Sequence, residues 1–280
     1  MTQLAQTTDG NIKRLPICND IGKRTLIMGI LNVTPDSFSD GGKYNRVDLA
    51  LSHAVEMVEA GADLIDLGAE STRPNHTPVS ALEEWDRLRE FLPALQDTVR
   101  VPLSVDTYKA EVAWHAVEAG VKVINDVWGG AYDPLMFDVV AQTGVPYVLM
   151  HNVMGLPKIA GNVVEVVYHW FEGQIEKAQK AGIQMEQIIL DPGIGFGKTL
   201  KQNLELLNHL DRFQVFGRPL LVGTSRKSMI GTVLDLPVQE RIEGTAATVA
   251  IAIARGADIV RVHDVKEMAR VVKMTDSMVR

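Results

Sequence analysis

Residues 51–67, LSHAVEMVEAGADLIDL, join a helical pattern, a glycine and a short apolar run in one stretch of chain. The helical pattern places apolar side chains on one face, at Leu51, Ala54, Val55 and Val58. Gly61 then stands where helices commonly end in a left-handed residue, a conformation without steric cost when there is no Cβ. The apolar run Leu64–Leu67 follows and predicts a strand covered on both faces.

The same unit recurs along the chain. Glycines take the position of Gly61 after further helical segments, at Gly120, Gly144, Gly182 and Gly256. Short apolar runs predict eight strands at Leu26–Leu31, Leu64–Leu67, Leu103–Val105, Val123–Ile124, Tyr147–Leu149, Ile188–Leu190, Leu220–Val222 and Ile259–Val262. This alternation predicts an α/β protein, and eight units in about 250 residues favour a single (β/α)8 TIM barrel. An open doubly wound sheet is the alternative, but residues 32–35, NVTP, lack the glycine-rich turn expected after its first strand.

Length and composition predict one globular domain. The 280 residues are 46% hydrophobic and 22% charged, and no linker or low-complexity block divides them. We place the barrel domain at residues 23–280 and expect residues 1–22 to be a short N-terminal extension, either a tail or a cap on the barrel bottom. The net charge of −7 argues against a nucleic-acid partner, because such binders attract phosphates with an excess of basic side chains.

Cysteine content and hydropathy indicate the compartment. Cys18 is the only cysteine, which excludes an internal disulfide and a cysteine-rich zinc site and fits a reducing cytosol. The first ten residues contain no apolar signal segment, and the longest apolar runs are shorter than the roughly 18 residues of a membrane span. We therefore expect a cytoplasmic protein that enters no membrane.

Polar side chains follow the predicted strands at their carboxyl ends, which face one mouth in a barrel. The set comprises Asn32, Asp66 with Glu70, Asp106, Asn125, His151, Asp191, Ser225–Lys227, Arg261 and His263. For any one of them a helix cap or a turn is the alternative, and Asp106 before the next helix fits that alternative. Caps alone require neither Lys nor Arg, so the whole set predicts a binding site.

The set contains two kinds of chemistry. Carboxylates and an amide that can accept and donate hydrogen bonds in one plane, as a flat heterocycle requires, stand at Asp106, Asn125 and Asp191. Donors and cations that suit a phosphate stand at Lys227, Arg261, His263 and Asn32. His263 alone also fits a structural histidine, although it shares a strand face with Arg261. We therefore expect a ligand that joins a flat ring to a phosphate.

Two loop segments follow predicted strands. Residues 192–199, PGIGFGKT, end like a phosphate-binding loop, but a proline occupies the position of the first glycine of a Walker motif, so we do not expect nucleotide binding there. Residues 32–42, NVTPDSFSDGG, are long and polar with Phe38 among them. A solvent-exposed crossover is the alternative, but this composition favours a loop that folds over a ligand.

Several motifs, taken in order, resemble the dihydropteroate synthase family over about residues 27–265. They are GILNVTPDSFSDGG at 29–42, ESTRP at 70–74, SVDT at 104–107, IND at 124–126, LMH at 149–151, DPGIGFGK at 191–198, SRKS at 225–228 and RVH at 261–263. The resemblance implies a transferase with a (β/α)8 barrel, usually a homodimer. It also implies the reaction, in which p-aminobenzoate is joined to hydroxymethyl-dihydropterin diphosphate, with release of pyrophosphate, in folate biosynthesis.

The resemblance also implies a role for each matching residue. The residues implied as catalytic are Asp106, Asn125, Asp191, Lys227, Arg261 and His263. Of these, Arg261 and His263 would hold the diphosphate together with Mg²⁺, the implied cofactor, whose ligand would be Asn32. The substrate-binding residues and closing loops would include Phe38, Thr72, Arg73, Pro74, Met150, Phe196 and Ser228. Met150 would pack on the pterin ring.

Two other functions remain open. A pterin-binding methyltransferase domain would share the barrel and the acidic pterin contacts, but the motifs at 225–227 and 71–74 favour a synthase. A catalytically silent relative that binds pterin or acts as an assembly subunit would keep the same fold. For a synthase we expect the methylene–oxygen bond to break largely before the aryl amine attacks, without a covalent enzyme intermediate.

Overall fold

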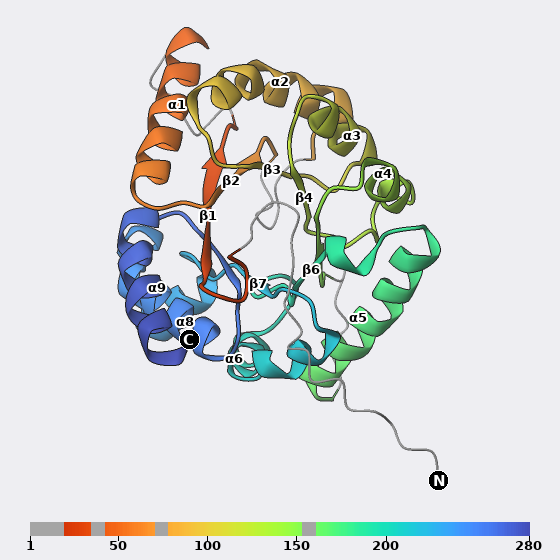
Figure 1. Cartoon of the computed structure of the whole chain (residues 1–280). Coiled ribbons are helices and arrows are strands. Elements are labelled where there is room, and N and C mark those ends of the chain that lie inside the picture. Colours follow the sequence, from red (N-terminus) through yellow and green to blue (C-terminus); the bar gives the residue numbers. More distant parts are fainter. Residues whose placement is uncertain (1–19, 35–42, 71–77, 153–160) are drawn as a thin grey trace.

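The computed structural model describes residues 20–34, 43–70, 78–152 and 161–280. Eight parallel strands form one sheet in the order β6-β5-β4-β3-β2-β1-β8-β7, and a parallel bridge between Leu190 and Leu220 joins its two edges. The helices surround the strands in chain order (Figure 1). The predicted single (β/α)8 barrel is confirmed.

Strands and helices alternate along the described chain. The strands are β1 (Leu26–Asn32), β2 (Leu64–Gly68), β3 (Leu103–Asp106), β4 (Val123–Asp126), β5 (Tyr147–Met150), β6 (Ile188–Asp191), β7 (Leu221–Val222) and β8 (Ile259–Val262). The α-helices are α1 (Lys43–Glu59), α2 (Ala81–Thr98), α3 (Ala110–Glu118), α4 (Met136–Thr143), α5 (Val163–Lys180), α6 (Leu200–Asn208), α7 (Ser228–Leu234), α8 (Ile242–Ala254) and α9 (Val265–Val279). Short 3₁₀ segments are η2 (Met185–Gln187), η3 (Leu210–Phe216) and η4 (Val238–Glu240).

The boundaries of the predicted strands differ slightly from those observed. Six of them continue one or two residues further at the carboxyl end, so that Asn32, Asp106 and Asp191 belong to β1, β3 and β6. The reason is that ladder hydrogen bonds use only the backbone, so a polar side chain does not end a strand. Leu220, predicted to begin a strand, forms only the isolated bridge to Leu190.

The helix-ending glycines take the predicted conformation. Their φ angles are +108° at Gly61, +101° at Gly120, +71° at Gly144, +101° at Gly182 and +95° at Gly256. Each turn returns the chain to the start of the next strand, where the pattern places an apolar run. The residue at which each of these helices ends and the chain turns back to the sheet is thus set by a local glycine.

Two apolar clusters hold the barrel together. One lies between the sheet and the helices and includes the large buried rings Phe91, Phe171 and Phe213. The other contains residues from alternate positions of the strands and comprises Ile21, Leu26, Met28, Leu64, Val123, Val148, Ile189, Leu221 and Ile259. We call this second cluster the lower interior, since most of its members lie near the amino ends of the strands.

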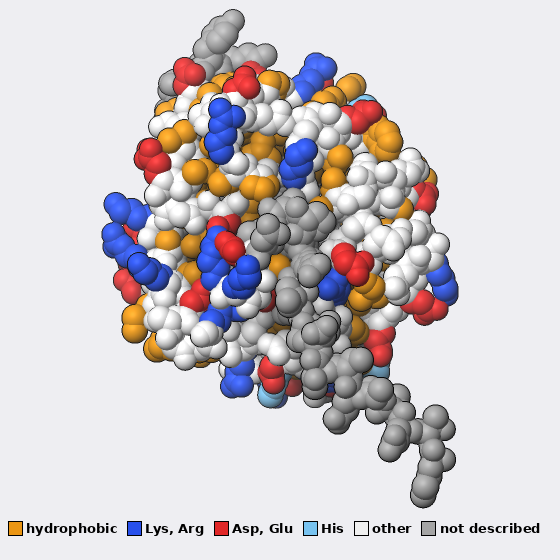
Figure 2. All heavy atoms as spheres, viewed as in Figure 1, with side chains coloured by type: hydrophobic (Ala, Val, Ile, Leu, Met, Phe, Trp, Pro, Cys, Tyr) orange, Lys and Arg blue, Asp and Glu red, His pale blue; other side chains and the backbone are white. Residues whose placement is uncertain are grey.

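The segment before β1 joins the lower interior through Ile21, which is 2% exposed. Of the predicted extension, Ile21 therefore packs against the barrel bottom, and residues 1–19 lie outside the described residues. On the face seen in Figure 2, acidic and basic side chains are interspersed over the described surface. In the described part of the chain, no helix combines the length and apolar character of a membrane span.

Candidate active site

The strand register brings the predicted site residues to one end of the barrel. Asn32 pairs with Gly68, Gly68 with Asp106, and Asp106 with Asn125 across β1 to β4. Further round the sheet, Met150 on β5 pairs with Asp191 on β6. The polar residues predicted at the strand ends therefore lie on neighbouring strands at the mouth, as expected.

A largely buried ionic network links four strands, β2, β3, β4 and β8. Arg261 on β8 donates from Nε to Asp66 Oδ2 at 2.6 Å and from Nη2 to Asp106 Oδ2 at 2.8 Å. Asn125 on β4 donates from Nδ2 to the same Asp66 oxygen at 2.9 Å. The network shows that Asp106 is not a cap of α3, whose N-cap residue is Lys109.

Burial strongly affects protonation in this network. Burial raises the pKa of Asp106 to about 7; the Arg261 charge opposes this shift and Asp66 adds to it. Burial also lowers the pKa of Arg261, but the charges of Asp66 and Asp106 outweigh it and raise that pKa above its ordinary value. Arg261 therefore stays charged, and its charge is shared between two carboxylates.

Asp191 and Lys227 form the other polar part of the mouth. Asp191 Oδ1 accepts a hydrogen bond from Gly193 N at 2.7 Å, and burial raises its pKa while Lys227 opposes the shift. Lys227 Nζ donates to the Ile194 carbonyl and lies 4.4 Å from the centroid of the Phe196 ring. Burial lowers the pKa of Lys227 to about 8, with Asp191 acting in the opposite direction.

The glycine-rich loop after β6 supports these two residues. Gly195 has a φ of +83°, and a Cβ there would lie 2.5 Å from Lys227 Cδ, so the loop approaches Lys227 too closely for a side chain. Lys198 Nζ donates to the backbone carbonyls of Gly193 at 2.9 Å, Phe196 at 3.1 Å and His151 at 3.2 Å. The lysine of the DPGIGFGK motif thus braces its own loop.

An apolar surface adjoins the polar groups. Met150 is 2% exposed and packs with Tyr108 and Val127, and the partly buried Trp128 and Phe196 contact this cluster. Met150 and Asp191 are neighbours across β5 and β6, so a flat ring that meets the carboxylate could also contact the thioether. The arrangement fits the predicted packing of Met150 on a ring.

Asn32 and His263 lie at the strand ends next to the network. A Cβ on Gly68 would lie 3.2 Å from Asn32 Oδ1, so the amide occupies space that only glycine leaves open. His263 Nδ1 lies 3.0 Å from Ser225 Oγ, and its backbone N–H donates to the same oxygen at 3.2 Å. The loops that follow β7 and β8 are thereby joined.

The remaining predicted residues are only partly placed. Phe38, Thr72, Arg73 and Pro74 lie outside the described residues. Ser228 begins α7 with an exposed side chain directly after Lys227. At the base of the ESTRP motif, Glu70 is buried and accepts from Tyr108 Oη at 2.6 Å, and it also pairs with Lys109.

Two residues of this site were noted in the sequence without a predicted role. Asp66 belongs to the strand-end set that predicts a binding site, but the sequence gives it no individual role, although the alternation along β2 and β8 places it on the same face as Arg261. Lys198 was expected only to be part of a motif. Its three acceptors are backbone carbonyls, and backbone acceptors leave no signal in a sequence.

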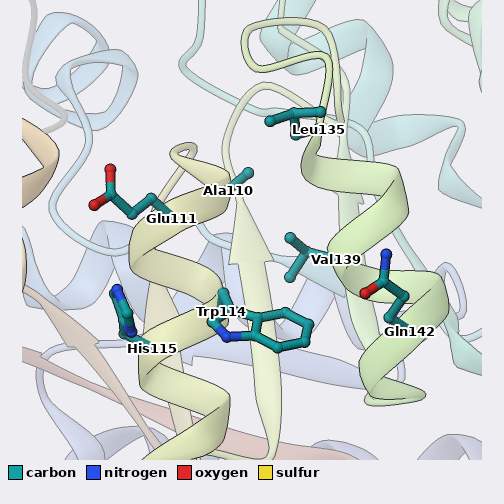
Figure 3. Close-up of a pocket in the computed structure, with 7 residues that line it drawn as sticks. All are labelled: Ala110, Glu111, Trp114, His115, Leu135, Val139 and Gln142. Atoms are coloured by element: carbon teal, nitrogen blue, oxygen red, sulfur yellow. The ribbon is translucent and has the colours of Figure 1, made fainter.

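A separate apolar groove lies outside the barrel between α3 and α4. Figure 3 shows Trp114 and His115 on α3 and Leu135, Val139 and Gln142 at α4, with Ala110 and Glu111 at the start of α3. None of the predicted site residues lines this groove. The groove is therefore separate from the candidate site at the barrel mouth.

Comparison with known proteins agrees with this geometry. The family model described as pterin binding enzyme matches residues 28–263. The dihydropteroate synthase of Clostridium beijerinckii is 53% identical over 262 residues, which cover 93% of this chain and 97% of that protein.

Solved structures give the same result. A dihydropteroate synthase from Clostridium difficile, determined in the presence of pteroic acid, superposes with a TM-score of 0.90 at 48% identity, covering 93% of this chain and 99% of that one. The Xanthomonas albilineans dihydropteroate synthase with 4-aminobenzoic acid gives a TM-score of 0.89 at 40% identity, covering 95% and 98%. Most of the chain is thus matched in sequence and in fold, and it belongs to the dihydropteroate synthase family of pterin-binding enzymes.

Proposed function

We propose that this chain is a transferase that condenses p-aminobenzoate with hydroxymethyl-dihydropterin diphosphate to give dihydropteroate and pyrophosphate. The observation that carries the proposal is the convergence of Asp106, Asn125, Asp191, Lys227 and Arg261 at one barrel mouth. Relatives with the same fold were solved with pteroic acid and with 4-aminobenzoic acid. The reaction is a step of folate biosynthesis.

The pterin ring fits the buried part of the mouth. Its amino group and ring N–H groups need acceptors, which Asp191, Asp106 and the carbonyl oxygen of Asn125 provide. Lys227 would donate to the opposite edge, where the pterin carries acceptors. Met150, which is buried, and Phe196, which is partly buried, would line the ring and would help to keep water from the reacting carbon.

The diphosphate and a Mg²⁺ ion would lie near Asn32, Arg261 and His263. The described residues contain no group of three His, Cys, Asp or Glu side chains that could hold a metal ion. Mg²⁺ often keeps several waters and takes few protein oxygens besides substrate phosphates, so one amide oxygen from Asn32 fits that mode of binding. When bound, the ion would offset charge on the departing diphosphate.

The residues of the mouth would supply binding and charge stabilisation rather than a nucleophile. As the methylene–oxygen bond breaks, its electron pair leaves with the diphosphate and positive charge spreads over the pterin. Asp191 and Asp106, both buried at the mouth, would stabilise that charge as carboxylates. The amine of p-aminobenzoate then bonds to the methylene carbon and loses a proton. Phe196 and Ser228, with Phe38, Thr72, Arg73 and Pro74 outside the described residues, would form the aminobenzoate pocket.

One assay tests the activity. Purified protein with Mg²⁺, p-aminobenzoate and the pterin diphosphate should yield dihydropteroate by mass spectrometry, and Asp258→Asn, a buried carboxylate at the barrel bottom, should remain active. Methyl-tetrahydrofolate binding without dihydropteroate formation would instead support a methyltransferase domain. Binding of pterin without turnover would support a silent relative. Trapping of a covalent pterin–enzyme adduct in a rapid quench would contradict the order of bond breaking.

The proposal includes a homodimer in the cytosol. Helix α8 exposes Ala247, Ile251 and Ala254 at helical spacing, and α7, which packs against it, exposes Val233 and Leu234 at 56% and 44%. An apolar surface that crosses two helices is typical of an interface. The single Cys18 suits a reducing compartment. Light scattering should give twice the chain mass, and Ile251→Asp should give a monomer.

A further inference from the structure

Asp66 occupies the centre of the buried network without a place in the proposed chemistry. Its side chain is 0% exposed, and one of its oxygens, Oδ2, accepts from both Arg261 Nε and Asn125 Nδ2, at 2.6 and 2.9 Å. Arg261 in turn donates to Asp106 at 2.8 Å. Three strands, β2, β4 and β8, therefore meet at a single carboxylate oxygen.

The carboxylate determines which way the Asn125 amide faces. A carboxylate accepts hydrogen bonds and cannot donate them, so the amide must turn its NH₂ group towards Asp66. The amide carbonyl oxygen is then the group left for a ligand. A neutral neighbour with its own amide would allow Asn125 to present either group.

Stability does not explain a charge at this position. The second carboxylate oxygen, Asp66 Oδ1, is buried and has no hydrogen-bond partner among the described residues, and the same holds for Ser104 Oγ on the adjacent strand. Burying an ionised group costs free energy, and apolar residues of similar volume often replace buried ion pairs without loss of stability. A role in ligand binding accounts for the residue better than a role in packing.

We propose that Asp66 is a positioning residue of the pterin subsite, which orients Asn125 so that its carbonyl oxygen accepts from a pterin N–H and which holds Arg261 beside Asp106. The inference rests on the proposed function, because it names how that site selects a ring with N–H donors. Asp66 itself does not touch the substrate; it acts through Asn125 and Arg261.

The test measures the affinity of 6-hydroxymethylpterin, a non-reacting ring, by calorimetry. Asp66→Asn should weaken binding at least about tenfold. The matched control Asp258→Asn, a buried carboxylate directly before β8 at the barrel bottom, should change it less than about twofold. The KM for p-aminobenzoate should stay within about twofold in both variants. Asp66→Ser, which leaves room for a water molecule, replaces Asp66→Asn if that variant does not fold.

A double-mutant cycle separates positioning from general damage. If Asp66 acts through Asn125, Asp66→Asn should weaken pterin binding less than about threefold in an Asn125→Ala background. A loss as large as in the wild-type background would show that Asp66 does not orient Asn125, and unchanged affinity in Asp66→Asn alone would overturn the inference while leaving the proposed function intact. Absence of pterin binding by the wild-type protein would overturn both.

Discussion

The two ends of the barrel interior are built from the same strands and contain opposite kinds of side chain. The lower interior is apolar, with Leu26, Leu64, Val123, Ile189 and Ile259 each at most 2% exposed. The upper interior contains charges and amides, namely Asp66, Asp106, Asn125, Asp191 and Arg261. Apolar burial lowers the free energy of the fold, whereas buried charges raise it unless they are paired.

Pairing at the upper end is incomplete. Asp66 Oδ1, Asp106 Oδ1 and Ser104 Oγ are buried without a hydrogen-bond partner among the described residues. Most buried polar atoms in folded proteins have partners, so such a group of exceptions indicates a place prepared for a ligand or ordered water. The comparison therefore suggests that the lower end stabilises the barrel and that the upper end is arranged for binding.

The largest effect is expected for Arg261→Met. The change leaves Asp66 and Asp106 buried without their shared cation, and removal of one partner from a buried ion pair typically costs about 3–5 kcal/mol. Urea unfolding at pH 8 should show this loss, together with loss of turnover. Adding Asp66→Asn to the variant should recover part of the stability, since it removes one unpaired charge. A loss below about 1 kcal/mol would show that the network is less desolvated than the geometry indicates.

The lower interior should respond in stability alone. Leu64→Ala removes a fully packed side chain, for which about 2–5 kcal/mol of unfolding free energy is typical. The KM values for both substrates should remain within about twofold, because the site lies at the other end of the strands. Steady-state kinetics on the folded fraction checks this. A severalfold rise in the KM for the pterin substrate would show that the two ends are coupled, and would contradict the division into a stabilising lower end and a binding upper end.

Asp191→Asn should impair substrate binding without lowering stability, which is the opposite of the result expected for Leu64→Ala. Hydrogen bonds to charged groups contribute about 1.5–3 kcal/mol each, so losing the carboxylate should reduce kcat/KM for the pterin substrate by roughly a hundredfold or more. Stability should stay the same or rise, because the variant removes a buried charge. Calorimetry should show pterin affinity falling much more than aminobenzoate affinity. Equal pterin affinity in variant and wild type would refute the assignment of Asp191.

The barrel and its polar mouth were both predictable from the sequence, but for different reasons. The barrel was predictable because each repeated unit carries its own local signal, such as the apolar stripe of residues 51–58, the left-handed Gly61 and the run at β2. The polar mouth was predictable because strand ends in a barrel converge. Only the last one or two residues of several strands were missed, since backbone pairing continues through polar side chains.

The pairing inside the mouth could not be predicted in the same way. Asp66 and Arg261 are 195 residues apart, and only the closed sheet brings them together. The resemblance assigns Arg261 to the diphosphate, and the structure adds that two of its nitrogens contact carboxylates, which the sequence did not indicate. The brace formed by Lys198 was equally hidden, because its partners are carbonyl groups that every residue possesses.

The upper end should also make stability depend on pH through Asp106. Burial raises its pKa from 3.8 to about 7, so between these values the unfolded chain has released a proton that the folded chain still holds. The folded state then binds more protons, and its stability falls as pH rises through this window. Between pH 4.5 and 7, the unfolding free energy should therefore fall less in Asp106→Asn than in the wild type, by on the order of 2 kcal/mol. Urea unfolding at several pH values measures this, and the same pH dependence in both proteins would show that Asp106 is ionised throughout.

The smallest effect is expected for Ser104→Ala, and it distinguishes two explanations of the incomplete pairing. If the buried hydroxyl has no partner, its removal should leave the unfolding free energy unchanged or raise it by up to about 1 kcal/mol, because a polar group no longer has to be desolvated. If an ordered water joins Ser104 to Asp66 on the adjacent strand, the variant should instead be less stable. Urea midpoints at pH 8 for Ser104→Ala and Ser104→Ala/Asp66→Asn decide between these outcomes. With a bridging water the two substitutions would be non-additive, whereas additive effects would mean that no water joins Ser104 to Asp66.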